Sequence, residues 1–409
     1  MLRTALAALR SGHWPSLIGA SLHFEVSFMV WLLIGALGVP IAEEFGLTAT
    51  QKGLLVGVPL LGGAALRILV GVCTDRFGPK PTGLALLVCE LAAVLWGWLG
   101  ATTYVQVLGV GLFLGFAGAS FAVAVPLASR VYPPDHQGLA LGVAAAGNSG
   151  TVLVAFFAPR LAQVVGWHGV FGLMAIPIVV TIVLFGLLVR GDGGRAPQVQ
   201  EERWWASTAA ALRHRSMYWL GFLYAVTFGG FVGLASFLPI FFHDQHGLDL
   251  VAAGSLTALC GLAGSVIRPV GGYVADRFGG LRVLGILFPV IMLLIVAVGQ
   301  LPALLWSASL MVAAVAALGF GNGVVFRVVS DRFQKQMGIA TGLVGAAGGF
   351  GGFLLPSWLG LLKDMTGTYG TGFHLFAALA AVATVSVALT LRRRGPLADQ
   401  VIDARSFRH

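Results

Sequence analysis

Two lone arginines inside apolar stretches are the residues of this chain best suited to chemistry. Arg67 lies in the stretch 60–80 and Arg268 in the stretch 262–282, and both stretches end in an Asp-Arg-Phe-Gly motif at a constant offset of 201 residues. A guanidinium group is planar, permanently charged and forked, which suits a small oxyanion. A charge inside a membrane costs about 2.5–3.5 kcal/mol. The repetition of this cost predicts that both arginines serve one anion.

The spacing places the two arginines at the same depth. Arg67 precedes Asp75 by eight residues, and Arg268 precedes Asp276 by eight residues. At about 1.5 Å per helical residue this is about 12 Å, close to the middle of a hydrocarbon core about 30 Å thick. Two such groups on equivalent helices can meet across a pseudo-two-fold axis. The alternative is that each arginine snorkels to the surface or pairs with a carboxylate, and the matched depth disfavours it.

The elements that carry these arginines are apolar segments. The chain has 409 residues, 57% hydrophobic, 10% charged and 58 of them Gly, which predicts an all-α polytopic membrane protein. The segments long enough to span a bilayer number twelve, at 17–39, 52–74, 82–101, 104–129, 138–162, 168–190, 216–242, 251–275, 283–301, 304–329, 338–362 and 371–391. The constant offset predicts two pseudo-symmetric six-helix bundles.

The distribution of Lys and Arg predicts the orientation. Basic residues crowd one set of loops and both termini, whereas the other set carries little beyond Lys52, Arg160 and Lys363. By the positive-inside rule we expect both termini to be cytoplasmic in a multi-pass protein of the cell inner (cytoplasmic) membrane. The net charge of +9 follows from this placement and does not indicate nucleic-acid binding. The expected parts are an N-terminal bundle (1–190), a cytoplasmic linker (191–215), a C-terminal bundle (216–391) and a cytoplasmic tail (392–409).

Short loops after the second and eighth segments repeat the same residue types. They are candidate gates, at Gly71, Asp75, Arg76, Gly78, Gly272, Asp276, Arg277 and Gly279. Their charged side chains can bond helix ends and neighbouring helices. The plainer interpretation is a tight turn whose charges face water, and the repetition disfavours it.

Glycine-rich stretches mark the fifth and eleventh segments, again at the offset of 201 residues. Their glycines are Gly147, Gly150, Gly348 and Gly351. Small residues let helices approach closely, and glycine also exposes backbone dipoles to a ligand; both interpretations stay open. Asn148 adds an amide that could donate to an anion.

Aromatic and titratable residues complete the candidate set. Four aromatic residues are candidates for lining the site: Phe28, Phe121, Tyr224 and Phe228. Glu25 and His23 in the first segment are candidates for proton coupling, since a carboxyl near a central cavity can carry a proton. The alternative for Glu25 is a polar residue packed between helices. The three cysteines (Cys73, Cys89 and Cys260) predict neither a disulfide nor a metal site, and no cofactor is expected.

Five stretches together resemble the nitrate/nitrite porter family (NarK-like) of the major facilitator superfamily. They are LRILVGVCTDRFGPK at 66–80, GLALGVAAAGNSG at 138–150, VIRPVGGYVADRFGG at 266–280, GFGNGVVFRVVSDRF at 319–333 and TGLVGAAGGFGGFLLP at 341–356. The resemblance covers essentially the whole chain. It implies that Arg67 and Arg268 grip the anion, that Asn148 is the asparagine of the first nitrate signature, and that the four aromatic residues surround the substrate. The second signature departs from the first, with Gly349 and Phe350 where the first has Asn148 and Ser149.

The resemblance implies a secondary active transporter of nitrate, with nitrite as co-substrate, that works by alternating access in nitrate assimilation. The short chain and the acid in the first segment slightly favour nitrate/proton symport over nitrate/nitrite exchange. Two alternatives are a transporter of another small anion and a membrane sensor without turnover. An enzyme is not expected, because no extramembrane stretch combines a nucleophile with a base or a metal cluster. The expected partners are nitrate, nitrite, protons and the lipid bilayer; the protein is expected to act as a monomer.

Overall fold

The computed structural model describes residues 12–133, 143, 146–190, 213–333 and 337–394, and these form helices with no strand among them. The helices of the first half are α2 (Trp14–Trp31), α3 (Leu33–Ala36), α4 (Gly38–Phe45), α5 (Ala49–Phe77), α6 (Pro79–Leu99), α7 (Tyr104–Gly118), α8 (Phe121–Arg130), η2 (Ala146–Ser149) and α10 (Gly150–Leu188). Those of the second half are α12 (Arg215–Tyr224), η3 (Ala225–Gly229), α13 (Gly230–His246), α14 (Leu250–Phe278), α15 (Gly280–Gly299), α16 (Leu304–Arg332), α17 (Met337–Thr366) and α18 (Gly370–Arg394).

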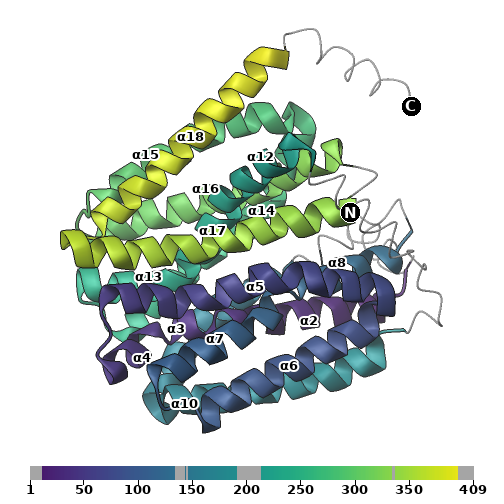
Figure 1. The fold of residues 1–409 in the computed structure, drawn as a ribbon, viewed down its shortest axis with the longest axis vertical. Coiled ribbons are helices and arrows are strands. Elements are labelled where there is room, and N and C mark those ends of the chain that lie inside the picture. The colour runs from purple at the N-terminus through teal and green to yellow at the C-terminus, as the bar shows by residue number, and fades with distance from the viewer. Residues whose placement is uncertain (1–11, 134–142, 144–145, 191–212, 334–336, 395–409) are drawn as a thin grey trace.

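The helices form two bundles that lie side by side, with α5 of the first bundle against α17 of the second (Figure 1). Within the described part of the chain, ten helical stretches are long and apolar enough to cross a membrane. One of them, Gly147–Leu188, covers two predicted segments because Gly166 turns the chain with a φ of 70°. The first predicted segment is the broken run α2–α4.

Several predicted segments are interrupted. The first is broken at Leu32 and at Leu37. Between these breaks lies Gly35, and because it has no side chain, the backbone of α13 at Ser236 packs directly against it. The fourth breaks after Gly118, between α7 and α8. The seventh contains the π-helical turn η3 between α12 and α13. Single-turn π-bulges of this kind are frequently found at functional sites.

The helices that carry the two arginines begin and end in the same way. Thr48 caps α5 with its side chain in a capping box, and Asp249 caps α14 through its carboxylate. Gly78 and Gly279 end these helices with φ values of 88° and 83°, a conformation that glycine adopts without strain. The end of the bundles where α5 and α14 terminate is called the DRFG end below, and the end where they begin is called the opposite end.

The predicted linker (191–215) and tail (392–409) lie mostly outside the described residues, as does the start of the fifth predicted segment.

Candidate anion-binding site

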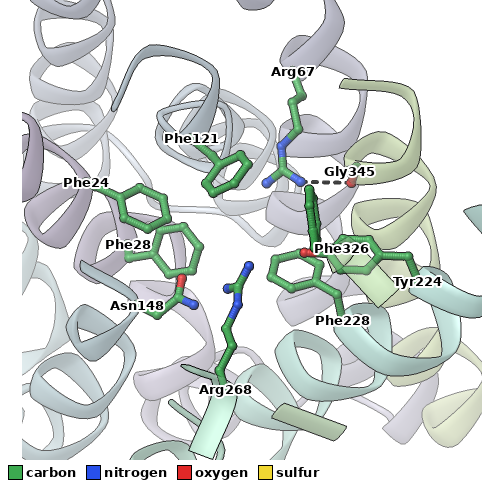
Figure 2. Close-up of a pocket in the computed structure, with 10 residues that line it drawn as sticks. All are labelled: Phe24, Phe28, Arg67, Phe121, Asn148, Tyr224, Phe228, Arg268, Phe326 and Gly345. Carbon is green, nitrogen blue, oxygen red and sulfur yellow. Dashed lines mark hydrogen bonds between the residues drawn. The ribbon is translucent and has the colours of Figure 1, made fainter. Parts of the chain in front are cut away.

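A small pocket lies between the two bundles and has about 240 Å³ of space between its atoms. Its lining residues come from both halves of the chain: Phe24, Phe28, Arg67, Phe121, Asn148, Tyr224, Phe228, Arg268, Phe326 and Gly345 (Figure 2). All seven residues that the sequence nominates for anion binding are in this set; their role in binding stays a prediction.

Arg67 enters the pocket from α5 and is held by backbone carbonyls. Its Nη1 donates to the Gly345 oxygen at 2.8 Å and its Nη2 donates to the Gly118 oxygen at 2.7 Å. The carbonyl of Gly118 is available because α7 ends there and its last carbonyls have no helical partner. The side chain is only 3% exposed, and its Nε has no hydrogen-bond partner. These carbonyl contacts hold the charge without neutralising it.

Aromatic rings also contact Arg67. Its guanidinium carbon lies 5.8 Å from the centre of the Trp31 ring and 5.6 Å from that of the Phe228 ring. Cation–π contacts of this kind contribute about 2 kcal/mol when desolvated. Trp31 belongs to the first bundle and Phe228 to the second, and their rings are nearly parallel at 6.5 Å. Rings from both bundles therefore stabilise the same charge.

Arg268 reaches the pocket from α14, on the side facing Arg67, and its guanidinium points into the space between Asn148 and Phe228 (Figure 2). The side chain is half-buried. The hydroxyl of Tyr224 interacts electrostatically with both arginines. Two cations that face one pocket repel each other while it is empty, and a bound anion relieves this repulsion.

The aromatic walls follow from the local backbone. Tyr224 directly precedes the π-helical turn and Phe228 lies within it, and their rings are parallel within 1° at 5.0 Å. Phe326 of α16 packs edge-on against Tyr224 at 4.8 Å. It also contacts Phe121 of α8 at 6.0 Å, so this pair joins the two bundles. Flat walls on both sides of a cationic fork suit a flat anion.

Asn148 lies in the short η2 turn and is buried, with an Oδ1 that has no hydrogen-bond partner. Its amide faces the same space as Arg268 (Figure 2). Among the residues that line the pocket, none is acidic, so the described lining carries two positive charges. Such a lining favours an anion.

Three lining residues were absent from the sequence-based set: Phe24, Phe326 and Gly345. Phe24 lies four residues before Phe28 on the same helix face, and helical spacing could have found it. Phe326 lies in the stretch 319–333 quoted above. Gly345 contributes a backbone carbonyl, which the pattern of side chains in a sequence cannot predict.

The signature glycines pack directly against the helices that carry the aromatic residues. A methyl group on Gly147 would lie 2.6 Å from the Phe24 ring, and one on Gly150 would lie 2.3 Å from the backbone carbonyl oxygen of Glu25. A methyl group on Gly348 would lie 2.6 Å from the Tyr224 ring, and Gly351 meets the π-helical turn. The structure therefore favours close packing over exposure of backbone dipoles as the reason for these glycines.

The titratable residues of α2 point in different directions. The Glu25 carboxylate accepts hydrogen bonds from Ser149 Oγ at 2.8 and 3.1 Å, next to Asn148 but outside the lined pocket. His23 is buried, contacts the Gly83 oxygen at 3.2 Å and packs on Phe185 of α10. His23 thus faces away from the pocket. Within the described chain no group of three His, Cys, Asp or Glu residues could hold a metal ion.

At the DRFG end the described ion pairs of the loop residues stay within one bundle. Asp75 pairs with Arg130 of α8 at 3.4 Å, and Asp276 pairs with Arg327 of α16 at 2.6 Å. Gly71 and Gly272 meet no atom within 4 Å of an added methyl group. The predicted gating role of these loops stays open, because the pairs do not join the bundles.

At the opposite end polar contacts join the bundles. Lys52 of α5 pairs with Asp244 of α13 at 2.7 Å, and Asp244 also accepts from the Tyr369 hydroxyl at 2.9 Å. Burial raises the pKa of the Tyr369 hydroxyl, which keeps it a donor. Asp364 of α17 accepts from the backbone nitrogens of Ala49 and Thr50 at the start of α5. The bundles are therefore closed at this end.

Comparison with known proteins supports this architecture. The family model of the Major Facilitator Superfamily matches residues 20–356. The chain is 36% identical over 389 residues to the "Probable nitrate/nitrite transporter NarK2" of Mycobacterium tuberculosis (strain H37Rv), covering 93% of this chain and 97% of that protein. It is 32% identical to the "Probable nitrate/nitrite antiporter NarK1" of Thermus thermophilus, covering 91% and 90%.

A solved structure gives the same fold. The bacterial homologue of the human lysosomal transporter Spinster, in an inward-facing and occupied conformation, matches with a TM-score of 0.71 at 18% identity, covering 94% of this chain and 97% of that one. The fold and these matches define a multi-pass membrane protein of the major facilitator class, with twelve helices in two bundles, and not an enzyme. Within that class, the chain belongs to the nitrate/nitrite porter family.

Proposed function

We propose that this protein transports nitrate, with nitrite as a second substrate, across the cytoplasmic membrane by alternating access. The observation that carries the proposal is the convergence of Arg67 and Arg268 on one small pocket whose described lining has no acidic residue. Nitrate is flat and singly charged. Arginine forks bind its oxygens in the plane, and the rings of Phe228, Tyr224 and Phe28 complement its faces.

The charge distribution supports an orientation. The DRFG end carries most of the loop Lys and Arg residues, so it faces the cytoplasm and both termini lie there. In this conformation the bundles are joined by polar contacts at the opposite end, which corresponds to a site closed to the outside. Rocking of the two bundles about the arginines would expose the site alternately to each side.

Proton symport is favoured as the coupling mode, with Glu25 as the proton-binding group. Glu25 directly follows Phe24, which lines the pocket, and accepts a hydrogen bond from Ser149. Protonation of Glu25 can therefore change this hydrogen bond and shift Asn148, the neighbour of Ser149 in the first signature. Moving one charge against the membrane potential costs about 2.3 kcal/mol per 100 mV. One proton per nitrate makes the step electroneutral, so accumulation that is driven inward by the membrane potential needs more than one proton per nitrate.

Nitrate/nitrite exchange is the second candidate. The relative from Thermus thermophilus is named an antiporter, and in this chain the described pocket lining contains no titratable acid. Exchange of two monovalent anions moves no net charge, so it needs no proton site.

The deciding experiment is nitrate uptake into proteoliposomes, with and without an inward proton gradient and with and without internal nitrite. Uptake that needs the gradient and ignores nitrite supports symport. Uptake that needs internal nitrite and ignores pH supports exchange. Failure of both, in vesicles that contain folded protein, contradicts nitrate as the substrate. Light scattering of detergent-solubilised protein tests the expectation that the transporter is a monomer.

A further inference from the structure

The seam between α5 and α17 joins the two bundles along a line of close contacts. The helices run antiparallel, and glycines on one or the other allow backbone contact. The facing pairs, from the opposite end inward, are Ala49 with Gly360, Gly53 with Pro356, Gly57 with Phe353, Ala64 with Gly349, and Arg67 with Gly345. The pocket therefore lies where this seam reaches the middle of the molecule.

The seam stops at the arginine. One turn further along α5, an added methyl group on Gly71 would meet no atom within 4 Å. On α17 the same holds for Gly342, one turn beyond Gly345. Among the glycine contacts of the described residues on these two helices, the hydrogen bond from Arg67 to Gly345 is the last before the helices separate toward the DRFG end. It also joins a charge of the first bundle to a carbonyl of the second.

An anion and the Gly345 carbonyl use the same group. A planar oxyanion binds a guanidinium through two neighbouring nitrogens, and each such pair includes at least one Nη atom. Each Nη atom of Arg67 carries two N–H groups and donates one of them to a carbonyl, whereas the Nε–H group is unpartnered. An anion bound to Arg67 therefore shares an Nη atom with a carbonyl and competes with that carbonyl for the position of the guanidinium. We propose that the Arg67–Gly345 hydrogen bond is a latch between the bundles, that Gly345 positions Arg67 through it, and that an anion bound to Arg67 opens it. The identity of the anion rests on the proposed function.

Three alanine substitutions on α17 separate this latch from general packing. A methyl group on Gly345 would lie 3.1 Å from both Cδ and Nη1 of Arg67 and would displace the guanidinium. A methyl group on Gly349 would lie 3.0 Å from Ala64, so Gly349→Ala strains the seam without touching Arg67. Gly342→Ala adds a methyl group to open space and serves as the matched control.

The test measures the distance between the bundles at the DRFG end in the full chain. Spin labels at Phe77→Cys and Phe278→Cys, both on exposed sites, report this distance by pulsed electron spin resonance in lipid nanodiscs. The three native cysteines are replaced by alanine. In protein without anion, Gly345→Ala and Arg67→Met should each move population toward shorter distances, because loss of the latch lets the bundles approach at the DRFG end. Their combination should move it no further, because both remove the same hydrogen bond between the bundles, and the bond to Gly118 that Arg67→Met also removes lies within the first bundle.

The controls decide between a latch and a packing effect. Gly342→Ala should match the parent, and Gly349→Ala combined with Arg67→Met should shift the distances further than either alone. Independent shifts from Gly345→Ala and Arg67→Met, or a parent-like Gly345→Ala, overturn the latch.

Addition of sodium nitrate tests the role of the anion. Saturating nitrate should shorten the distance in the parent and change it less than half as much in Gly345→Ala. An equal response in both proteins overturns the opening of the latch by the anion. A parent that ignores nitrate, while Gly345→Ala and Arg67→Met remain non-additive, contradicts nitrate as the substrate and leaves the structural latch in place.

Discussion

The two halves of the chain carry the same arginine at the same position of the repeat, but they surround it differently. Arg67 is almost fully buried and donates to carbonyls of both bundles. Arg268 is half-buried and points into the pocket near Tyr224 (Figure 2). The duplicated sequence thus gives one arginine that is fixed by backbone carbonyls and one whose surroundings leave it more accessible to a ligand.

The difference extends to the residues around each arginine. Glu25 and Ser149 are bonded beside the pocket in the first half, whereas the positions 201 residues later hold Val226 and Phe350. The bonded carboxylate and hydroxyl pair beside the site therefore has no counterpart at the same positions of the second half. A repeat that has diverged in this way can keep an arginine for the anion in each half while only the first half carries the proposed proton-coupling group.

The largest expected effect comes from replacing either arginine by lysine. Arg67→Lys and Arg268→Lys should each reduce nitrate uptake at least about 100-fold, because each loses two or more charged hydrogen bonds worth about 1.5–3 kcal/mol each. Near-normal uptake by either variant in proteoliposomes would contradict a site built on both arginines.

Thermal stability measured on the same two variants tests the comparison itself. Arg67→Lys should lower the melting temperature more than Arg268→Lys, since only Arg67 makes described hydrogen bonds to Gly345 and Gly118. Equal losses of stability would show that the two surroundings are energetically equivalent.

The second prediction concerns the acid found only in the first half. Glu25→Gln should abolish the dependence of nitrate uptake on an inward proton gradient while preserving exchange, because the amide keeps the shape but cannot carry the proton. Glu90→Gln is the matched control: Glu90 is fully buried and accepts from Ser27 at 2.8 Å, away from the lined pocket. Unchanged proton dependence in Glu25→Gln would refute its role.

A smaller effect is expected at Tyr224, whose hydroxyl interacts with both arginines. Tyr224→Phe keeps the ring parallel to Phe228 and removes only the hydroxyl. Loss of one hydrogen-bonding group near a charge costs about 1.5 kcal/mol, which corresponds to a rise in KM of about tenfold. The measurement is KM and maximal rate of nitrate uptake in proteoliposomes. A fall in maximal rate with unchanged KM would show that the hydroxyl does not contribute to nitrate binding.

Much of the fold followed from the sequence because it depends on long-range periodicity. Apolar segment length predicts the spans, and the offset of 201 residues predicts two bundles; the comparisons confirm both the fold and the family. The breaks near Leu32, Gly118 and Ala225 were not predicted, since each depends on contacts with a neighbouring helix. Hydropathy does not register such contacts.

The site was only partly predictable for a related reason. Charged and aromatic side chains stand out in an apolar segment, and the structure brings all seven of those nominated around one pocket. Gly345 and Gly118 contribute carbonyls, which every residue has, so only the fold selects them. The direction of His23, away from the pocket, likewise depends on where Gly83 and Phe185 pack.

The smallest expected effect lies farthest from the arginines, at the closed opposite end. Lys52 and Asp244 are 20% and 18% exposed, and exposed ion pairs contribute only about 0–1 kcal/mol. Lys52→Met should therefore change the maximal uptake rate by about twofold or less and leave the KM for nitrate unchanged, because the pocket residues are untouched.

Asp364→Asn should change the maximal uptake rate more than Lys52→Met does, since Asp364 accepts from two backbone nitrogens at the start of α5. If Lys52→Met instead changed KM as much as Tyr224→Phe, the anion affinity would depend on closure of the opposite end, and the contrast between the two arginines would be secondary to it.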